Sequence, residues 1–119
     1  MAGDLYSYTF GALAGGTTTS DAYDVSHNEV VEIFARAGTA IGTAGGTAVT
    51  VHIDAQDIDG NWFSDAAGSF DVGTAVSTVK AYRRGESVGA ADPAVLGMKQ
   101  RVRLVTGGSI QFGINVVGF

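Results

Sequence analysis

Cysteine is absent from this chain of 119 residues. The chain therefore has no disulfide bond and no thiolate metal site, which fits a reducing compartment without requiring one. Proline occurs once, and no apolar run approaches the about 18 residues that a transmembrane helix needs. No lysine or arginine precedes Arg36, so the basic start of a secretory signal peptide is missing. We expect neither a membrane span nor a signal peptide.

Basic residues are scarce in the first part of the chain. Residues 1–75 contain ten acidic residues and one basic residue, whereas residues 76–119 contain two acidic and six basic residues. Two solvated faces explain this division, and the alternative is a pair of complementary surfaces that meet in an oligomer or on a charged partner. The net charge is −5 and the basic residues form no dense run, so we do not expect nucleic-acid binding.

Abundant glycine, threonine and valine favour strands and turns over helices. We expect seven or eight short strands in one domain that spans residues 1–119. Strands are predicted at residues 5–10, 47–56, 69–72 and 76–84, and residues 11–21 are predicted to be a small-residue loop, so that a flexible N-terminal arm fits within residues 1–21. An all-β antiparallel sandwich or a closed barrel follows.

Two segments carry helical signals. Ser26 and Glu29 are spaced as in a helix capping box, but residues 28–37 are rich in β-branched and aromatic residues. We predict a strand there, with a helix as the alternative. Residues 92–97 (DPAVLG) have the Asp, Pro and Gly signals of a single helical turn.

The last 21 residues contain the strongest pattern in the chain. Two alternating runs flank Gly107-Gly108, which is typical of a β-hairpin. A three-residue loop at residues 106–108 keeps the charged residues off the apolar face, because directly opposed residues point the same way. Leu104 then lies opposite Ile110. The predicted core face consists of Val102, Leu104, Ile110, Phe112, Ile114 and Val116.

The other face of this hairpin is the first candidate for a partner interface. Arginine is enriched at interfaces, and Gly113 permits the close approach of another backbone. The terminal Phe119 is expected to pack on the core or on a neighbour. The alternative is that the arginines belong to a solvated strand face. The candidate interface residues are Arg83, Arg84, Arg101, Arg103, Gln111, Gly113, Asn115 and Phe119.

The acidic turn after residue 56 has part of a calcium-loop pattern. Asp57, Asp59 and Asn61 are two residues apart, and Asp54 is a further candidate ligand, but Trp62 and Gly68 replace the glycine and glutamate of the full motif. A polar turn is the better interpretation, and we expect no metal and no other cofactor.

Catalytic motifs are missing around the two histidines. His27 and His52 accompany no nucleophile elbow, and no zinc-protease, phosphate-binding or dinucleotide-binding motif occurs. We expect ordinary surface or cross-strand histidines and a protein that is not an enzyme.

Aromatic residues offer a different candidate site. Trp62 and Tyr82, with Tyr6 and Tyr8, would form a stacking platform for sugars in a carbohydrate-binding or adhesion module. The alternative is that Trp62 packs over the open end of a sandwich.

A family resemblance covers roughly residues 28–119. The long strand with its acidic turn (TAVTVHIDAQDIDGNWFSDA) and the terminal segment (QRVRLVTGGSIQFGINVVGF) occur in an order that resembles small virion structural proteins of tailed bacteriophages, especially capsid decoration (cement) proteins. The resemblance implies a jelly-roll-like sandwich that forms homo-oligomers, often trimers. It implies a place on the outer capsid surface of the virion, where the protein clamps neighbouring major capsid proteins, after synthesis in the host cytoplasm.

The residues themselves favour binding over chemistry. We therefore expect a capsid decoration protein without catalytic residues, with the major capsid protein as its partner. The alternatives are the carbohydrate-binding module, for example in a tail fibre, and another neck or tail component of the virion.

Overall fold

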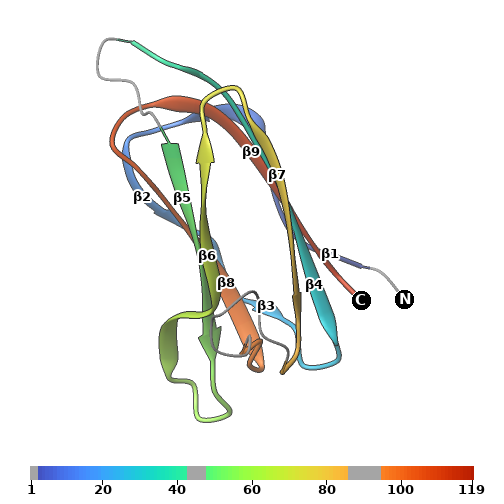
Figure 1. Ribbon diagram of the computed structural model, residues 1–119. Coiled ribbons are helices and arrows are strands. Elements are labelled where there is room, and N and C mark those ends of the chain that lie inside the picture. The colour runs from blue at the N-terminus through green and yellow to red at the C-terminus, as the bar shows by residue number, and fades with distance from the viewer. Residues whose placement is uncertain (1–2, 43–47, 86–94) are drawn as a thin grey trace.

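The computed structural model describes residues 3–42, 48–85 and 95–119, which form two antiparallel sheets packed face to face (Figure 1). The described strands are β1 (Gly3–Leu13), β2 (Gly16–Thr19), β3 (Tyr23–Asp24), β4 (Val30–Ala40), β5 (Ala48–Gln56), β6 (Trp62–Gly73), β7 (Ser77–Arg83), β8 (Lys99–Thr106) and β9 (Ile110–Gly118). Among the described residues, there is no helix that is long and apolar enough to span a membrane.

The strand order is that of a jelly roll. Sheet A has the order β1-β9-β4-β7, and sheet B has the order β2-β8-β5-β6 with β3 also paired to β8. Most consecutive strands alternate between the two sheets, which is the double Greek-key connection of this fold. The prediction of an all-β, jelly-roll-like antiparallel sandwich is confirmed, with nine strands in the described residues instead of seven or eight.

The core lies between the sheets and follows directly from sequence alternation. In β5, Val49, Val51 and Ile53 are buried and face inward, while Thr50 and His52 face outward. Strand β9 contributes the largest fully buried side chain, that of Phe112. Each such apolar side chain adds roughly 1.5–3 kcal/mol when it leaves water, so the inward rows of the two sheets hold the fold together.

The predicted terminal hairpin is wrong. Strand β8 pairs with β2, β3 and β5, and β9 pairs with β1 and β4. Leu104 therefore lies opposite Val51, and the segment after Thr106 arches from sheet B to sheet A instead of turning back within one sheet. The predicted core face is confirmed, because every one of its members is buried: Val102, Leu104, Ile110, Phe112, Ile114 and Val116.

An arch and a hairpin bury the same alternate residues, which explains this error. In a hairpin the two apolar stripes lie side by side in one sheet, whereas in an arch they face each other across the core. Alternation reports which way a side chain points and contains no information about which strand is the neighbour.

The N-terminal segment is more regular than predicted. Residues 11–21 were expected to form a loop or arm, but β1 continues to Leu13, and Gly16–Thr19 is β2, paired with β8. The register of β1 against β9 shifts between Tyr8 and Gly11. This bulge places Phe10 over the outer face of sheet A, where its side chain is 38% exposed.

The segments with helical signals are not helical where the structure describes them. Residues 30–40 are β4, which confirms the strand prediction, and the carboxylate of Asp24 accepts hydrogen bonds from the backbone and hydroxyl of Ser26 in the preceding turn. Of the predicted turn at residues 92–97, residues 92–94 lie outside the described residues and residues 95–97 have no regular structure. The predicted short strand at residues 69–72 is the end of the longer β6.

Candidate functional site

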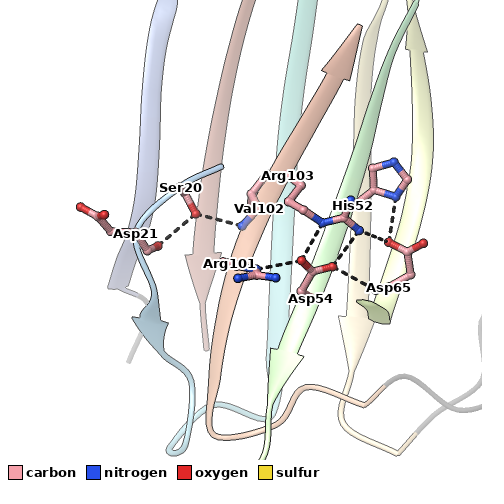
Figure 2. A network of polar contacts seen from close by, with 8 residues as sticks. All are labelled: Ser20, Asp21, His52, Asp54, Asp65, Arg101, Val102 and Arg103. Carbon is pink, nitrogen blue, oxygen red and sulfur yellow. Dashed lines mark hydrogen bonds and ion pairs between the residues drawn. The ribbon is translucent and has the colours of Figure 1, made fainter. Parts of the chain in front are cut away.

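Two arginines from the predicted interface form an ion-pair network inside the chain. Arg101 and Arg103 project from β8 over the outer face of sheet B and converge on Asp54 of the neighbouring β5 (Figure 2). Their Nε atoms lie 2.9 and 2.7 Å from Asp54 Oδ2. A second nitrogen of Arg103 lies 3.0 Å from Asp54 Oδ1. Asp54 is fully buried beneath the two guanidinium groups.

The network fixes the protonation state of Asp54. Burial by itself raises the pKa of this carboxyl, but the hydrogen bonds from Arg103, Arg101 and the Asp65 amide more than offset burial and lower the pKa to about 2. Conversely, the bonds to Asp54 raise the pKa of Arg103. Asp54 is therefore ionised at neutral pH, and its charge is matched within the molecule.

The network extends to both sides of Asp54. Arg103 also reaches the carboxylate of Asp65, and the same carboxylate oxygen lies 2.8 Å from Nδ1 of His52, within hydrogen-bond distance. On the other side, the guanidinium of Arg101 lies 4.4 Å from the ring centroid of Trp62, in a cation–π contact. The acidic first part of the chain and its basic last part thus meet here within one molecule.

The second part of the predicted interface lies on the opposite side of the sandwich. Gln111, Gly113 and Asn115 belong to β9 and face outward from sheet A, whereas Arg101 and Arg103 face outward from sheet B. The expectation that they share one face is wrong, because it followed from the hairpin. All five residues point away from the core as predicted, but they do not form a single surface.

Gly113 does permit a close approach, and the approaching backbone belongs to the same chain. A Cβ atom at this position would lie 2.9 Å from Cα of Phe10 in β1. Asn115 donates hydrogen bonds to the side chains of Asp4 and Ser7, also in β1, and Gln111 accepts hydrogen bonds from Thr39. These residues of β9 bind it to its two neighbouring strands, β1 and β4.

The remaining predicted interface residues have separate environments. The Arg84 side chain donates hydrogen bonds to the carbonyl oxygens of Val25, Asn28 and Gly97, so it fastens the β3–β4 loop to both ends of the β7–β8 connection. Arg83 is exposed on β7. Phe119 continues the pairing with β4 through its backbone, while its side chain is 44% exposed.

The predicted sugar platform does not assemble. Tyr82 is buried in the core, where burial raises its pKa to about 12. Trp62 lies over the outer face of sheet B and is covered in part by Arg101. The ring of Tyr6 is stacked on that of Tyr23, with 6.4 Å between the ring centroids. Tyr6 belongs to sheet A and Trp62 to sheet B, so the two do not form one aromatic surface.

The polar residues considered for chemistry have structural partners. One Asp57 oxygen accepts hydrogen bonds from the amides of Asp59 and Asn61, and the other accepts one from the Asn61 side chain, so this carboxylate closes the turn. No group of three potential metal ligands occurs among the described residues. His52 and Asp65 resemble a base with its orienting carboxylate, but no serine or threonine hydroxyl in the described ranges is hydrogen-bonded to His52.

An apolar groove opens at the end of the sandwich that carries the β5–β6 turn. It has a volume of about 680 Å³ and is lined almost entirely by apolar atoms. Several large apolar side chains around it are exposed, with Ile58 at 83% and Phe63 at 54%. Val95 and Met98 line the opposite wall. The Asp57 and Arg84 side chains at its rim are engaged in the acidic turn and in bonds to backbone carbonyls, so the described residues supply no convergent polar anchors there.

Sequence reasoning missed Asp65 and the groove, and it considered Asp54 only as a candidate metal ligand. Asp54 was visible as an acid on the polar side of β5, but its basic partners could not be chosen without the strand order. Asp65 adopts a left-handed conformation with φ of 58°, which places its amide 3.0 Å from Asp54 Oδ1, and no pattern in the sequence signals this bulge. The groove has a weak signal, since Ile58 and Met98 are apolar residues within or beside predicted turns.

Comparison with known proteins identifies the fold. No family model and no curated protein sequence matches this chain. The structure is similar to a subunit of the disulfide-linked pili that form Bacillus endospore appendages, with a TM-score of 0.54, 14% identity, and coverage of 99% of this chain and 86% of that one. It is also similar to a chain of infectious bursal disease virus, Gt strain, with a TM-score of 0.51, 11% identity, and coverage of 98% of this chain but 31% of that one. At these identities the likeness establishes a shared β-sandwich fold.

Proposed function

We propose that this protein is a non-enzymatic structural protein of a tailed-bacteriophage virion, a capsid decoration protein that binds the outer capsid surface and stabilises the shell. The apolar groove beside the β5–β6 turn is the observation that carries the proposal. Its volume of about 680 Å³ suits protein side chains or a small ligand, and the part of its wall that the structure describes is almost entirely apolar, unlike a site that orients a polar substrate. A protein partner with apolar side chains fits this chemistry, and the major capsid protein is the partner we assign.

Three further observations support a binding role. The charged groups on sheet B are satisfied by one another, so they are not held ready for a reaction. The jelly-roll sandwich has two broad sheet faces that a partner could contact. The likeness to a chain of infectious bursal disease virus is consistent with a virion protein, and repeated modest contacts on a symmetric shell would add up through avidity.

The test uses capsids of the producing phage purified without this protein. The purified wild-type chain is expected to co-sediment with expanded capsids and to raise the temperature at which the shell disassembles in a calorimeter. Coverage of the whole shell supports decoration, whereas a few copies at one vertex would instead place the protein in the neck or tail. Absence of capsid binding would sink the proposal.

A matched pair of variants tests the groove. Ile58→Asp introduces a charge at an 83% exposed apolar position of the turn, and it is expected to weaken capsid binding at least about tenfold without loss of folding. Thr17→Asp adds the same charge on an exposed position of β2 and serves as the control. Equal binding by both variants would remove the groove from the capsid contact.

A second candidate is a subunit of a surface filament, which the likeness to the endospore appendage pilus favours because it covers nearly all of both chains. Those pili are disulfide-linked, and this chain has no cysteine, so a filament of this protein would lack that covalent link. Electron microscopy of the purified protein separates the two candidates, since a decoration protein gives discrete particles and a pilus subunit gives fibres.

A further inference from the structure

On the outer face of sheet A, strand β4 presents a row of three evenly spaced side chains. Val31, Ile33 and Ala35 are buried, so the alternate residues Glu32, Phe34 and Arg36 point outward. Phe34 stands at the middle of the row and is 41% exposed. An acid and a base therefore flank a large apolar side chain at equal spacing on one strand.

The neighbouring strands leave this row accessible. Phe34 is flanked by Val79 of β7, which is 59% exposed, and by Asn115 of β9. The positions beside Glu32 and Arg36 are small or uncharged, namely Ala81, Val117, Ser77 and Gly113. The surface beside Phe34 is apolar on the β7 side, while on the β9 side Phe10 covers Gly113 and the Asp4 carboxylate lies next to Asn115. Arg83 of β7 is a further charge, two positions beyond the residue that lies beside Glu32.

Both charges in the row lack an oppositely charged partner among the described residues. The Glu32 carboxylate makes no hydrogen bond or ion pair there. The Arg36 guanidinium lies 4.1 Å from the ring centroid of Phe10, which orients it but does not neutralise it. The arginines of sheet B, in contrast, are both held by Asp54.

We propose that this face binds a second copy of the same chain about a two-fold axis that passes through Phe34. A two-fold rotation about an in-plane axis perpendicular to β4 brings the two β4 strands together in opposite directions. Glu32 of one copy then faces Arg36 of the other, the reciprocal pair forms on the other side of the axis, and Phe34 packs on Phe34. The row is complementary to its own rotated image, which is the property that an isologous interface requires.

The dimensions of side chains and sheets agree with this arrangement. Residues 32 and 36 are four positions apart, which is about 13 Å along a strand, so the two ion pairs lie on either side of the aromatic pair. Packed sheets lie about 10 Å apart, a distance that extended Glu and Arg side chains span together. The Phe10 rings support the arginines from the side. The inference does not depend on capsid binding, because it concerns the isolated chain.

The decisive experiment exchanges the charges of the row and measures the oligomeric state by sedimentation. Wild-type protein is expected to form dimers. Glu32→Arg places two positive charges opposite each other, Arg36→Glu places two negative charges opposite each other, and each is expected to raise the dimer Kd at least about tenfold. Asp21→Arg, the same charge change on the exposed loop between β2 and β3, is the control and is expected to leave the Kd unchanged.

Two combinations identify the two-fold geometry itself. The double variant Glu32→Arg/Arg36→Glu restores opposite charges at both contacts and is expected to dimerise like the wild type. A mixture of the two single variants is expected to form a heterodimer, because one copy then carries two bases and the other two acids. A monomeric wild type, a trimer insensitive to both single changes, or no rescue by the double variant and the mixture would each overturn the proposal. Circular dichroism of every variant separates lost association from lost folding.

Discussion

The two outer faces of the sandwich differ in whether their charged side chains have oppositely charged partners within the chain. On sheet B, Arg101 and Arg103 close over a buried aspartate, so the charges of this network are matched within the chain. On sheet A, Glu32 and Arg36 have no charged partner within the described residues, and Phe34 is exposed between them. Arginine content alone therefore does not locate unpaired charge, whereas the row on β4 carries two charges without a charged partner in the described residues, which is why we propose it as the contact with a second copy.

The largest effect is expected from the centre of the sheet B network. Asp54→Ala leaves Arg101 and Arg103 facing each other without a counter-charge and leaves the Asp65 amide unpaired, so we expect a loss of about 3 kcal/mol in the free energy of unfolding. Denaturant unfolding measures this loss. Asp71→Ala removes an exposed carboxylate that accepts one hydrogen bond from Thr50 and should cost less than about 1 kcal/mol. Equal losses for the two variants would show that the Asp54 network contributes no more to stability than the single hydrogen bond of Asp71.

Acid should lower the free energy of unfolding that the same network contributes. The folded-state pKa of Asp54 is about 2, below its ordinary value of 3.8, so its stabilising contribution is complete above that ordinary value and disappears as the pH falls through about 2. The contribution is about 2 kcal/mol at neutral pH. We expect the unfolding free energy of the wild type to fall over this range, and that of Asp54→Asn to fall less. Parallel pH profiles for the two proteins would contradict the assignment.

A smaller effect on stability is expected where the bulge of β1 lies against β9. Gly113→Ala introduces a Cβ atom 2.9 Å from the backbone of Phe10, and the strand must shift to accept it, at a cost of about 1–2 kcal/mol. Gly107→Ala is the control, because a Cβ atom there meets nothing within 4 Å. Thermal unfolding of both variants gives the comparison, and a neutral Gly113→Ala would mean that β1 can move away freely.

The smallest effect on folding is expected at the centre of the exposed row. Phe34→Thr keeps a strand-forming residue and removes a side chain that is already 41% exposed, so the folding free energy of the monomer should change by less than about 0.5 kcal/mol. Denaturant unfolding at a concentration where the wild type is monomeric tests this value. The dimer Kd should rise in the same variant. A large loss of folding stability would assign Phe34 to the core and weaken the contrast between the faces.

Much of the fold was predictable because alternation records burial. The inward positions of residues 102–104 and 110–116 followed from the requirement that apolar side chains leave water, and the structure places them in the core. The partner of each strand was not predictable, since Gly107-Gly108 serves an arch between sheets as well as a hairpin within one. Hence the core was predicted correctly, but the neighbours of β8 and β9 were not.

The candidate site was less predictable for the same reason. Arg103 and Asp54 are separated by 49 positions in the sequence, and only the pairing of β8 with β5 makes them neighbours. The bulges at Phe10 and Asp65 each re-aim a side chain, and they depend on local register shifts rather than on residue type. Sequence alone could thus nominate Arg101 and Arg103 but could not show that their charges are already matched.

The position of β9 between β1 and β4 has a consequence for how fast the molecule forms. Sheet A pairs Gly118 with both Gly3 and Val31, so the strand that joins β1 to β4 is synthesised after both of them. On the ribosome, β1 and β4 must wait without their common neighbour until β9 emerges. Topologies dominated by such distant pairings fold in milliseconds to seconds rather than microseconds. We therefore expect slow refolding, with β1 and β4 unprotected from hydrogen exchange until β9 has docked.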